Sequence, residues 1–284
     1  MKWTDDRSGN VEDRRGSGSG GAIVGGGLGT LIIAAIIFFL GGDPSSILSS
    51  SGGNSSAPTE QRDLNANELK VREFVQMITA ENEQTWTKIF ADNGMQYRPA
   101  RVVLFESTTQ SGCGTAQSAM GPFYCPADQT VYMDMSFFKE LQQQFGAQVT
   151  EFTIAYVMAH EMGHHVQTLL GTTQQVDKLR RAGQYSEAQM NRVSVATELQ
   201  ADFYAGVWAK QTDSREHILE PGDIDAAISA AEAVGDDNIQ KRSQGYVNQE
   251  SFTHGSSAQR KEWFMKGYTS GDIRQGNTFD QLLK

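Results

Sequence analysis

The sequence lacks the features that mark two common classes of protein. It has only two cysteines in 284 residues and no CxxC pair, which argues against a zinc site built from paired thiolates. It has no basic stretch or arm, and its 24 Lys and Arg residues are outnumbered by 34 Asp and Glu residues, so nucleic acid is not an expected partner. The acidic excess is typical of a solvated surface. The length fits one globular domain with appended segments, or two small domains.

The two cysteines, Cys113 and Cys125, lie among Gly, Ser and Pro residues, so both are expected in loops. A disulfide between them would close a short loop and add about 3 kcal/mol of stability by the loop-entropy relation. It would also require an oxidising compartment. Two free buried thiols are the alternative.

One long hydrophobic run is present, from Ala22 to Leu40. It carries no charge, and as a helix it would span about 29 Å, close to the hydrocarbon thickness of a bilayer. Residues 22–40 are therefore expected to form a transmembrane helix. A cleaved signal peptide is the competing interpretation, but the sequence FFLGGDPSS at the end of the run offers no A-x-A cleavage site.

The charges around the run predict its orientation. The basic residues before it are Lys2, Arg7, Arg14 and Arg15, and the next one along the chain is Arg62. The positive-inside rule therefore predicts a single-pass protein of the inner membrane, with a cytoplasmic N-terminus and a periplasmic domain. A disulfide would agree with that location. Glycines at the start of the run and just before it recur every four residues, and Gly21, Gly25 and Gly29 could pair two copies into a homodimer.

The composition divides the chain into four parts. Residues 1–21 are expected to form a disordered cytoplasmic tail, residues 22–40 the transmembrane helix, residues 41–64 a flexible Ser- and Gly-rich linker, and residues 65–284 the domain. Capping and periodicity predict helices over 65–92, 136–145, 150–170, 186–210, 223–234 and 256–268, and strands over 102–106 and 130–135. The expected fold class is α+β, mostly helical with a small sheet.

The segment AHEMGHH, within the helix expected over 150–170, carries the candidate chemistry. His160 and His164 are one helical turn apart on one face, so both imidazoles can bind one zinc ion. Glu161 lies beside them, where it can act as the general base for a water molecule. An amphipathic helix with solvated histidines is the alternative, but the flanking residues are apolar, and buried histidines need partners.

A catalytic zinc site needs a third protein ligand, and the segment ATELQADFYAG offers one. Glu198 and Asp202 are again one turn apart, amid apolar residues. We expect Glu198 to bind the metal and Asp202 to accept a hydrogen bond from His160, which fixes its tautomer. A surface glutamate with a like-charged neighbour is the alternative.

These motifs together resemble the bacterial neutral zinc metallopeptidase family. The resemblance rests on KWTDDRSGNVEDRRG, HEMGHHVQ, TELQADFYAG and FTHGSSAQRKEWFMKGY, and it covers nearly the whole chain. The Glu198–Asp202 spacing is also similar to that of gluzincins, the thermolysin-like and prenyl-protease-like enzymes. The resemblance implies a zincin-like domain with one Zn²⁺ ion.

The resemblance also implies a role for THGSSAQR, which has His254 six residues before Arg260. Membrane gluzincins carry a similar pair, in which the histidine is expected to hydrogen-bond the oxyanion of the tetrahedral intermediate. Arg260 would orient a carboxylate of the site. The present sequence has Gly255 where that pattern usually has Pro. A helix-capping loop with a solvated histidine is the alternative.

The expected function is hydrolysis of extracytoplasmic polypeptides by an endopeptidase, with water activated by zinc and Glu161. Two alternatives remain open: a membrane-anchored scaffold with a vestigial zinc site, and a zinc hydrolase of a non-peptide amide. Residues 130–135, TVYMDM, could supply a strand edge for the substrate peptide. His165 is expected to be structural and His217 to lie in a loop.

Overall fold

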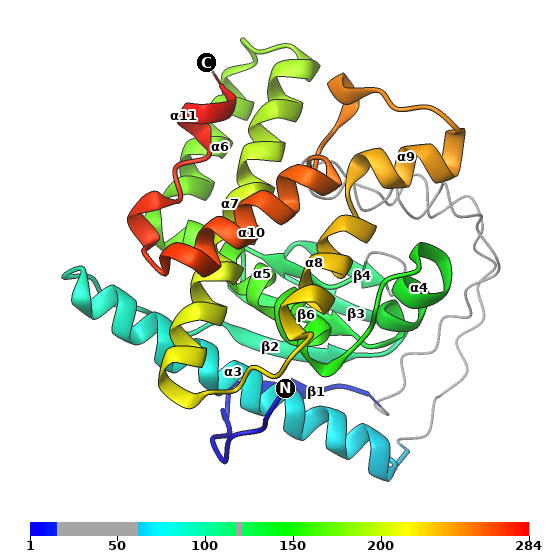
Figure 1. Ribbon diagram of the computed structural model, residues 1–284, viewed down its shortest axis with the longest axis vertical. Helices are drawn as coiled ribbons and strands as arrows, with labels where there is room; N and C mark the ends of the chain where they lie inside the picture. Colours follow the sequence, from blue (N-terminus) through cyan, green and yellow to red (C-terminus); the bar gives the residue numbers. More distant parts are fainter. Residues whose placement is uncertain (16–61, 118–120, 284) are drawn as a thin grey trace.

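The computed structural model describes residues 1–15, 62–117 and 121–283 (Figure 1). Within these ranges the protein is mostly helical with two small sheets, which confirms the expected fold class. The predicted transmembrane helix 22–40, its glycine face and nearly all of the predicted linker lie outside the described residues. None of the helices in the described ranges is both long and apolar enough to cross a membrane.

The helices account for most of the described domain. The α-helices are α3 (Ala66–Asp92), α4 (Ser136–Phe145), α5 (Glu151–Leu170), α6 (Thr172–Ala182), α7 (Glu187–Glu216), α8 (Asp223–Ala233), α9 (Asp236–Gln244), α10 (Ser257–Ser270) and α11 (Phe279–Leu282). Two short 3₁₀ helices are η3 (Gln249–Ser251) and η4 (Ile273–Gln275).

Polar side chains start the long helices as the sequence predicted. The side chains of Asn65, Thr150, Ser186 and Ser256 each accept a hydrogen bond from the backbone N–H three residues on, at the starts of α3, α5, α7 and α10. Helix α4 has the predicted bounds, but its cap residue is Met135, whose side chain makes no capping bond. Helix α7 also continues to Glu216, beyond the predicted end at Lys210.

The larger sheet has the strand order β1-β2-β6-β5. Its strands are β1 (Val11–Asp13), β2 (Arg101–Phe105), β5 (Phe123–Cys125) and β6 (Thr130–Asp134), and only the β5–β6 pair is antiparallel. Strands β3 (Thr108–Ser111) and β4 (Gly114–Gln117) form a separate hairpin. Because β6 lies between β2 and β5, the expectation that TVYMDM offers an open edge is wrong. The edge strands of this sheet are β1 and β5.

Residues 1–15 are ordered and pack against the domain, so the expectation of a disordered tail is wrong for them. Strand β1 extends the sheet by pairing with β2 in parallel, in the register Val11↔Val102. Trp3 packs on Phe74 of α3, with ring centroids 5.3 Å apart. The composition of the segment is polar, but its backbone and Trp3 find partners in distant parts of the chain.

Helices α5 and α7 form the centre of the domain, and α10 crosses α7 (Figure 1). These crossings depend on glycine. A Cβ on Gly206 of α7 would overlap the carbonyl oxygen of Phe264, and one on Gly267 of α10 would overlap that of Phe203. The two backbones are therefore in direct contact, closer than side chains would allow.

The predicted disulfide is confirmed. Cys113 and Cys125 are bonded, with a Cα–Cα distance of 5.8 Å. The bond joins the turn of the β3–β4 hairpin to the end of β5, and no cysteine is left free.

Candidate metal centre

The first part of the candidate site is one buried face of α5. His160, Glu161 and His164 are 7%, 4% and 9% exposed. The one-turn spacing of the histidines brings their ring centroids to 4.9 Å from each other. The apolar residues around them bury this helix on most sides, so the polar groups require partners within the protein.

Glu198 of α7 supplies the third group. Its Oε2 atom lies 3.2 Å from His160 Nε2, and its Oε1 atom lies 3.5 Å from His164 Nε2. One ligand atom from each of the three residues lies within 4.8 Å of the others, which is close enough to share one metal ion. The packing of α5 against α7 brings the HExxH motif and the carboxylate together.

Asp202 lies one turn further along α7 and is fully buried. Its Oδ1 atom accepts hydrogen bonds from His160 Nδ1 at 2.9 Å and from the Tyr156 hydroxyl at 2.6 Å. Arg260 of α10 donates to both oxygens, from Nε at 2.8 Å and from Nη2 at 2.9 Å. A buried carboxylate is therefore paired with a buried guanidinium while it orients the first histidine.

Neighbouring opposite charges determine the protonation of the buried carboxylates and of His160. Burial alone would raise the pKa of Asp202, but Arg260 and His160 outweigh it and hold that pKa below its usual range. Burial likewise opposes ionisation of Glu198, whose pKa is nevertheless held well below normal by His164 and His160. Burial disfavours protonated His160, but Asp202 and Glu198 raise its pKa to about 10. Asp202 and Glu198 therefore favour a positive charge at His160, which lies between them.

Glu161 behaves differently from the other two carboxylates. Burial raises its pKa, and the nearby histidines only partly offset that effect. Its Oε2 atom is buried and has no hydrogen-bond partner among the described residues. An unpaired buried carboxylate oxygen is costly unless a bound group satisfies it. Glu161 is therefore a basic side chain available to a molecule in the site.

Gln167, one turn after His164 on α5, was not predicted as a site residue. Its Oε1 atom accepts the hydrogen of His164 Nδ1 at 2.9 Å, while its amide nitrogen donates to the Thr197 carbonyl at 2.7 Å and to Gln200 Oε1 at 3.1 Å. The second histidine is thus oriented by an amide, and the first by a carboxylate. In the sequence HHVQ, the spacing of three residues between His164 and Gln167 was the signal that could have predicted this contact.

Asp236, at the start of α9, was also not predicted. Its Oδ2 atom accepts backbone hydrogen bonds from Thr253, His254 and Gly255 at 2.6–2.9 Å, and its Oδ1 atom lies 3.2 Å from His254 Nδ1. His254 and Glu198 lie close enough to shift each other's pKa. The loop that carries His254 is therefore held by Asp236, a carboxylate that no sequence motif marks.

The donor set fits a zinc ion. Both histidines have an acceptor at Nδ1, which leaves each Nε2 atom directed toward Glu198. Two imidazole nitrogens and one carboxylate are a ligand set that catalytic zinc prefers. The buried oxygen of Glu161, which lacks a partner among the described residues, provides the independent sign that the site is built for a further bound group.

The remaining histidines lie outside this group. His165 is fully buried, with Nδ1 3.0 Å from the Tyr124 hydroxyl and Nε2 2.6 Å from the Arg98 carbonyl, so it ties α5 to β5 and the loop before β2. His217 ends α7 in the left-handed conformation.

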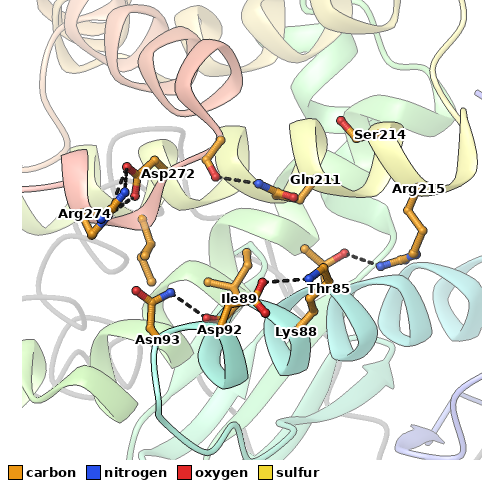
Figure 2. Close-up of a pocket in the computed structure, with 12 residues that line it drawn as sticks. Thr85, Lys88, Ile89, Asp92, Asn93, Gln211, Ser214, Arg215, Asp272 and Arg274 are labelled. Carbon is orange, nitrogen blue, oxygen red and sulfur yellow. Dashed lines mark hydrogen bonds and ion pairs between the residues drawn. The ribbon is translucent and has the colours of Figure 1, made fainter.

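A separate polar pocket of about 560 Å³ lies between α3, the end of α7 and residues 271–274 (Figure 2). Its cations are already in ion pairs: Lys88 with Asp92 at 2.8 Å, Arg274 with Asp272 at 2.8 Å, and Arg215 with Glu81. This charge balance gives it no evident preference for an anion, and it shares no residue with the metal centre.

Comparisons with known proteins agree with the site. A family model described as "putative neutral zinc metallopeptidase" matches residues 1–279. "Uncharacterized protein YpfJ" of Escherichia coli K12 is 45% identical over 222 residues, which is 78% of this chain and 76% of that protein. "Uncharacterized protein Rv2575" of Mycobacterium tuberculosis H37Rv is 47% identical over 192 residues, covering 64% of this chain and 63% of that protein. No solved structure matches the chain. The match over nearly the full length shows that the chain belongs to the neutral zinc metallopeptidase family.

Proposed function

We propose that the protein is a zinc-dependent endopeptidase that hydrolyses peptide bonds of extracytoplasmic polypeptides. The observation that carries the proposal is Glu161. A purely structural zinc site needs only its ligands, whereas here a buried carboxylate with a raised pKa lies beside them. The disulfide supports an oxidising, extracytoplasmic location.

His160, His164 and Glu198 would hold the zinc ion, which supplies Lewis-acid polarisation of the scissile carbonyl and makes water more acidic. Glu161 accepts the proton of the attacking water, and it later delivers that proton to the leaving amine. Its raised pKa suits both roles, since a stronger base takes the proton more readily and its acid form persists closer to neutral pH.

Several side chains hold this arrangement in place. Asp202 and Gln167 each accept a hydrogen from the Nδ1 atom of one histidine, so both Nε2 atoms keep their lone pairs for the metal. Arg260 neutralises Asp202 and fixes its orientation. His254, held by Asp236, donates a hydrogen bond to the oxyanion that forms from the carbonyl oxygen.

The edge strand β5 is the proposed support for the substrate. It pairs with β6 on one side, and an extended peptide added along its other side would continue the sheet. Strand β5 packs against α5, the helix that carries Glu161, and this contact supports a substrate position along β5. A peptide added to β5 would lie along the metal centre.

The test uses the full-length chain with bound zinc and a broad library of peptides analysed by mass spectrometry. Glu161→Gln should keep the zinc content of the wild type and lose about 10²–10⁴ in rate, because only the general base is removed. Glu187→Gln, an exposed change at the start of α7, is the matched control and should leave both unchanged. Wild-type protein that retains zinc and cleaves no peptide would contradict the proposal. Such a result would favour a scaffold, or a hydrolase of a non-peptide amide if cell-wall amides are cleaved instead.

A further inference from the structure

Residues 1–15, the N-terminal arm, are tied to three distant parts of the domain by backbone hydrogen bonds. The N–H of Ser8 donates to the Gln76 carbonyl of α3 at 3.0 Å. Strand β1 forms the edge next to β2, where Val102 N–H donates to the Asn10 carbonyl at 2.9 Å. The N–H of Lys2 donates to the Ile218 carbonyl, after the end of α7, at 2.8 Å. Figure 1 shows the blue arm lying beside α3 at the β2 side of the sheet.

The arm also satisfies polar groups that the rest of the domain buries. Glu81 of α3 is fully buried, and the Thr4 hydroxyl donates to its Oε1 atom at 2.6 Å. The other oxygen of Glu81 is paired with Arg215, which reaches across from α7 and also donates to Thr85 at 3.0 Å (Figure 2). Trp3 Nε1 donates to Glu151, the first residue of α5, at 3.0 Å. Removing the arm would expose the edge of β2 and the Glu81 region together.

Two arginines of the arm, Arg14 and Arg15, form ion pairs within the arm and hydrogen bonds to the domain. Arg15 is 8% exposed, pairs with Asp13 at 2.6 Å and donates to the Glu68 carbonyl at 2.8 Å. Arg14 pairs with Glu12 at 2.8 Å and donates to Thr109 of β3 at 3.0 Å. These contacts give Arg14 and Arg15 a structural role. Two of the four basic residues before the hydrophobic run are thus explained by the fold, without a cytoplasmic N-terminus.

We infer that the N-terminal arm is an integral part of the peptidase domain, docked in its own chain, and that both lie on the same side of the membrane. A strand paired with β2, and a hydroxyl bonded to a fully buried carboxylate, form only when both partners share one compartment.

This arrangement differs from the single-pass topology predicted from the charges, in which the arm and the domain face opposite sides. The same-side topology and the single-pass topology predict opposite results of chemical labelling. Neither topology depends on whether the protein is a peptidase, so the labelling tests the topology independently of the proposed function.

The first measurement compares the two ends in cells that express the full-length chain. Asp5→Cys in the arm and Glu187→Cys in the domain each place a thiol at an exposed position, while both native cysteines are held in a disulfide. Intact spheroplasts are treated with a membrane-impermeant maleimide, before and after permeabilisation. The inference expects the same labelled fraction at both positions under each condition. Labelling of one position alone in intact spheroplasts would overturn it.

The second measurement tests docking directly. Asp6 and Gln84 are both exposed, and Gln84 Nε2 donates to Asp6 Oδ2 at 2.7 Å. In membranes carrying the Asp6→Cys/Gln84→Cys variant, a short bis-maleimide should join the tryptic peptides 3–7 and 73–88, whereas either single variant should give no such product. In cells that co-express the two single variants, with Asp6→Cys on one copy and Gln84→Cys on the other, no such product should form. Failure to link the two peptides in the double variant, or an abundant product from the two single variants, would refute docking within one chain.

Discussion

The pair formed by Asp202 and Arg260 gives the sharpest quantitative prediction. In Asp202→Asn, the amide keeps the shape of the side chain but removes the negative charge. The Arg260 guanidinium, 4% exposed, then has no carboxylate beside it. Breaking a buried ion pair by removing one partner costs about 3–5 kcal/mol. For a domain of this size, that loss lowers Tm by roughly 6–20 °C.

A second substitution separates stability from metal binding. Arg260→Met in the Asp202→Asn background removes the uncompensated charge, so the double variant should regain more than half of the lost stability. Its zinc affinity should remain about 10–100-fold below that of the wild type, because His160 still lacks its carboxylate partner. The assays are urea denaturation of the metal-free protein and competition for zinc with a chelator.

Two results would refute this reasoning. If Asp202→Asn unfolds at the same urea concentration as the wild type, the ion pair contributes nothing to stability. If the double variant is less stable than the single one, the destabilisation does not come from a charge left without its partner. In either case the network around His160 would need a different energetic explanation.

Three further predictions concern residues outside that pair. Gly206→Ala should destabilise the protein by at least about 2 kcal/mol in urea denaturation, because the added methyl group overlaps the backbone of α10; wild-type stability would contradict the close contact. Replacing Cys113 and Cys125 together with serine should cost about 3 kcal/mol, measured the same way against the oxidised wild type; equal stability would show that the bond does not constrain the unfolded chain. Burial lowers the pKa of His254, but Asp236 outweighs it and raises that pKa, so protonated His254 persists to higher pH. With Nδ1 directed at Asp236, only the protonated ring offers a hydrogen at Nε2, so Asp236→Asn should move the alkaline limb of the pH–rate profile to lower pH. An unmoved limb would remove His254 from the mechanism.

Local signals in the sequence were enough to predict much of the helical framework. Asn65 with Glu68 and Ser186 with Gln189 form the capping boxes that start α3 and α7, since capping depends on residues within one turn. The spacing of His160 and His164 likewise fixes their common face without any tertiary information. The disulfide was expected from the composition around two cysteines.

Contacts between distant segments could not be predicted from the local sequence pattern of either segment. The packing of Gln167 against the Thr197 carbonyl and the capture of the His254 loop by Asp236 depend on how helices cross. Strand β1 has three residues in a polar segment, and only its pairing with β2 makes it a strand. The open edge was assigned to β6 because the short strand β5 carried too little periodicity to be predicted.

The position of the arm in the sequence has a consequence for biosynthesis. The arm leaves the ribosome before the residues that receive it, and these extend as far as Asp223, which the Met1 nitrogen approaches at 3.3 Å. Docking is therefore complete only when most of the chain has been made, although the arm's partners in α3 and β2 are made earlier. Long-range pairings of this kind form slowly and leave an interval in which an unprotected strand can associate with another molecule. Such a chain would gain from a chaperone that holds the nascent N-terminus until translation has passed α8.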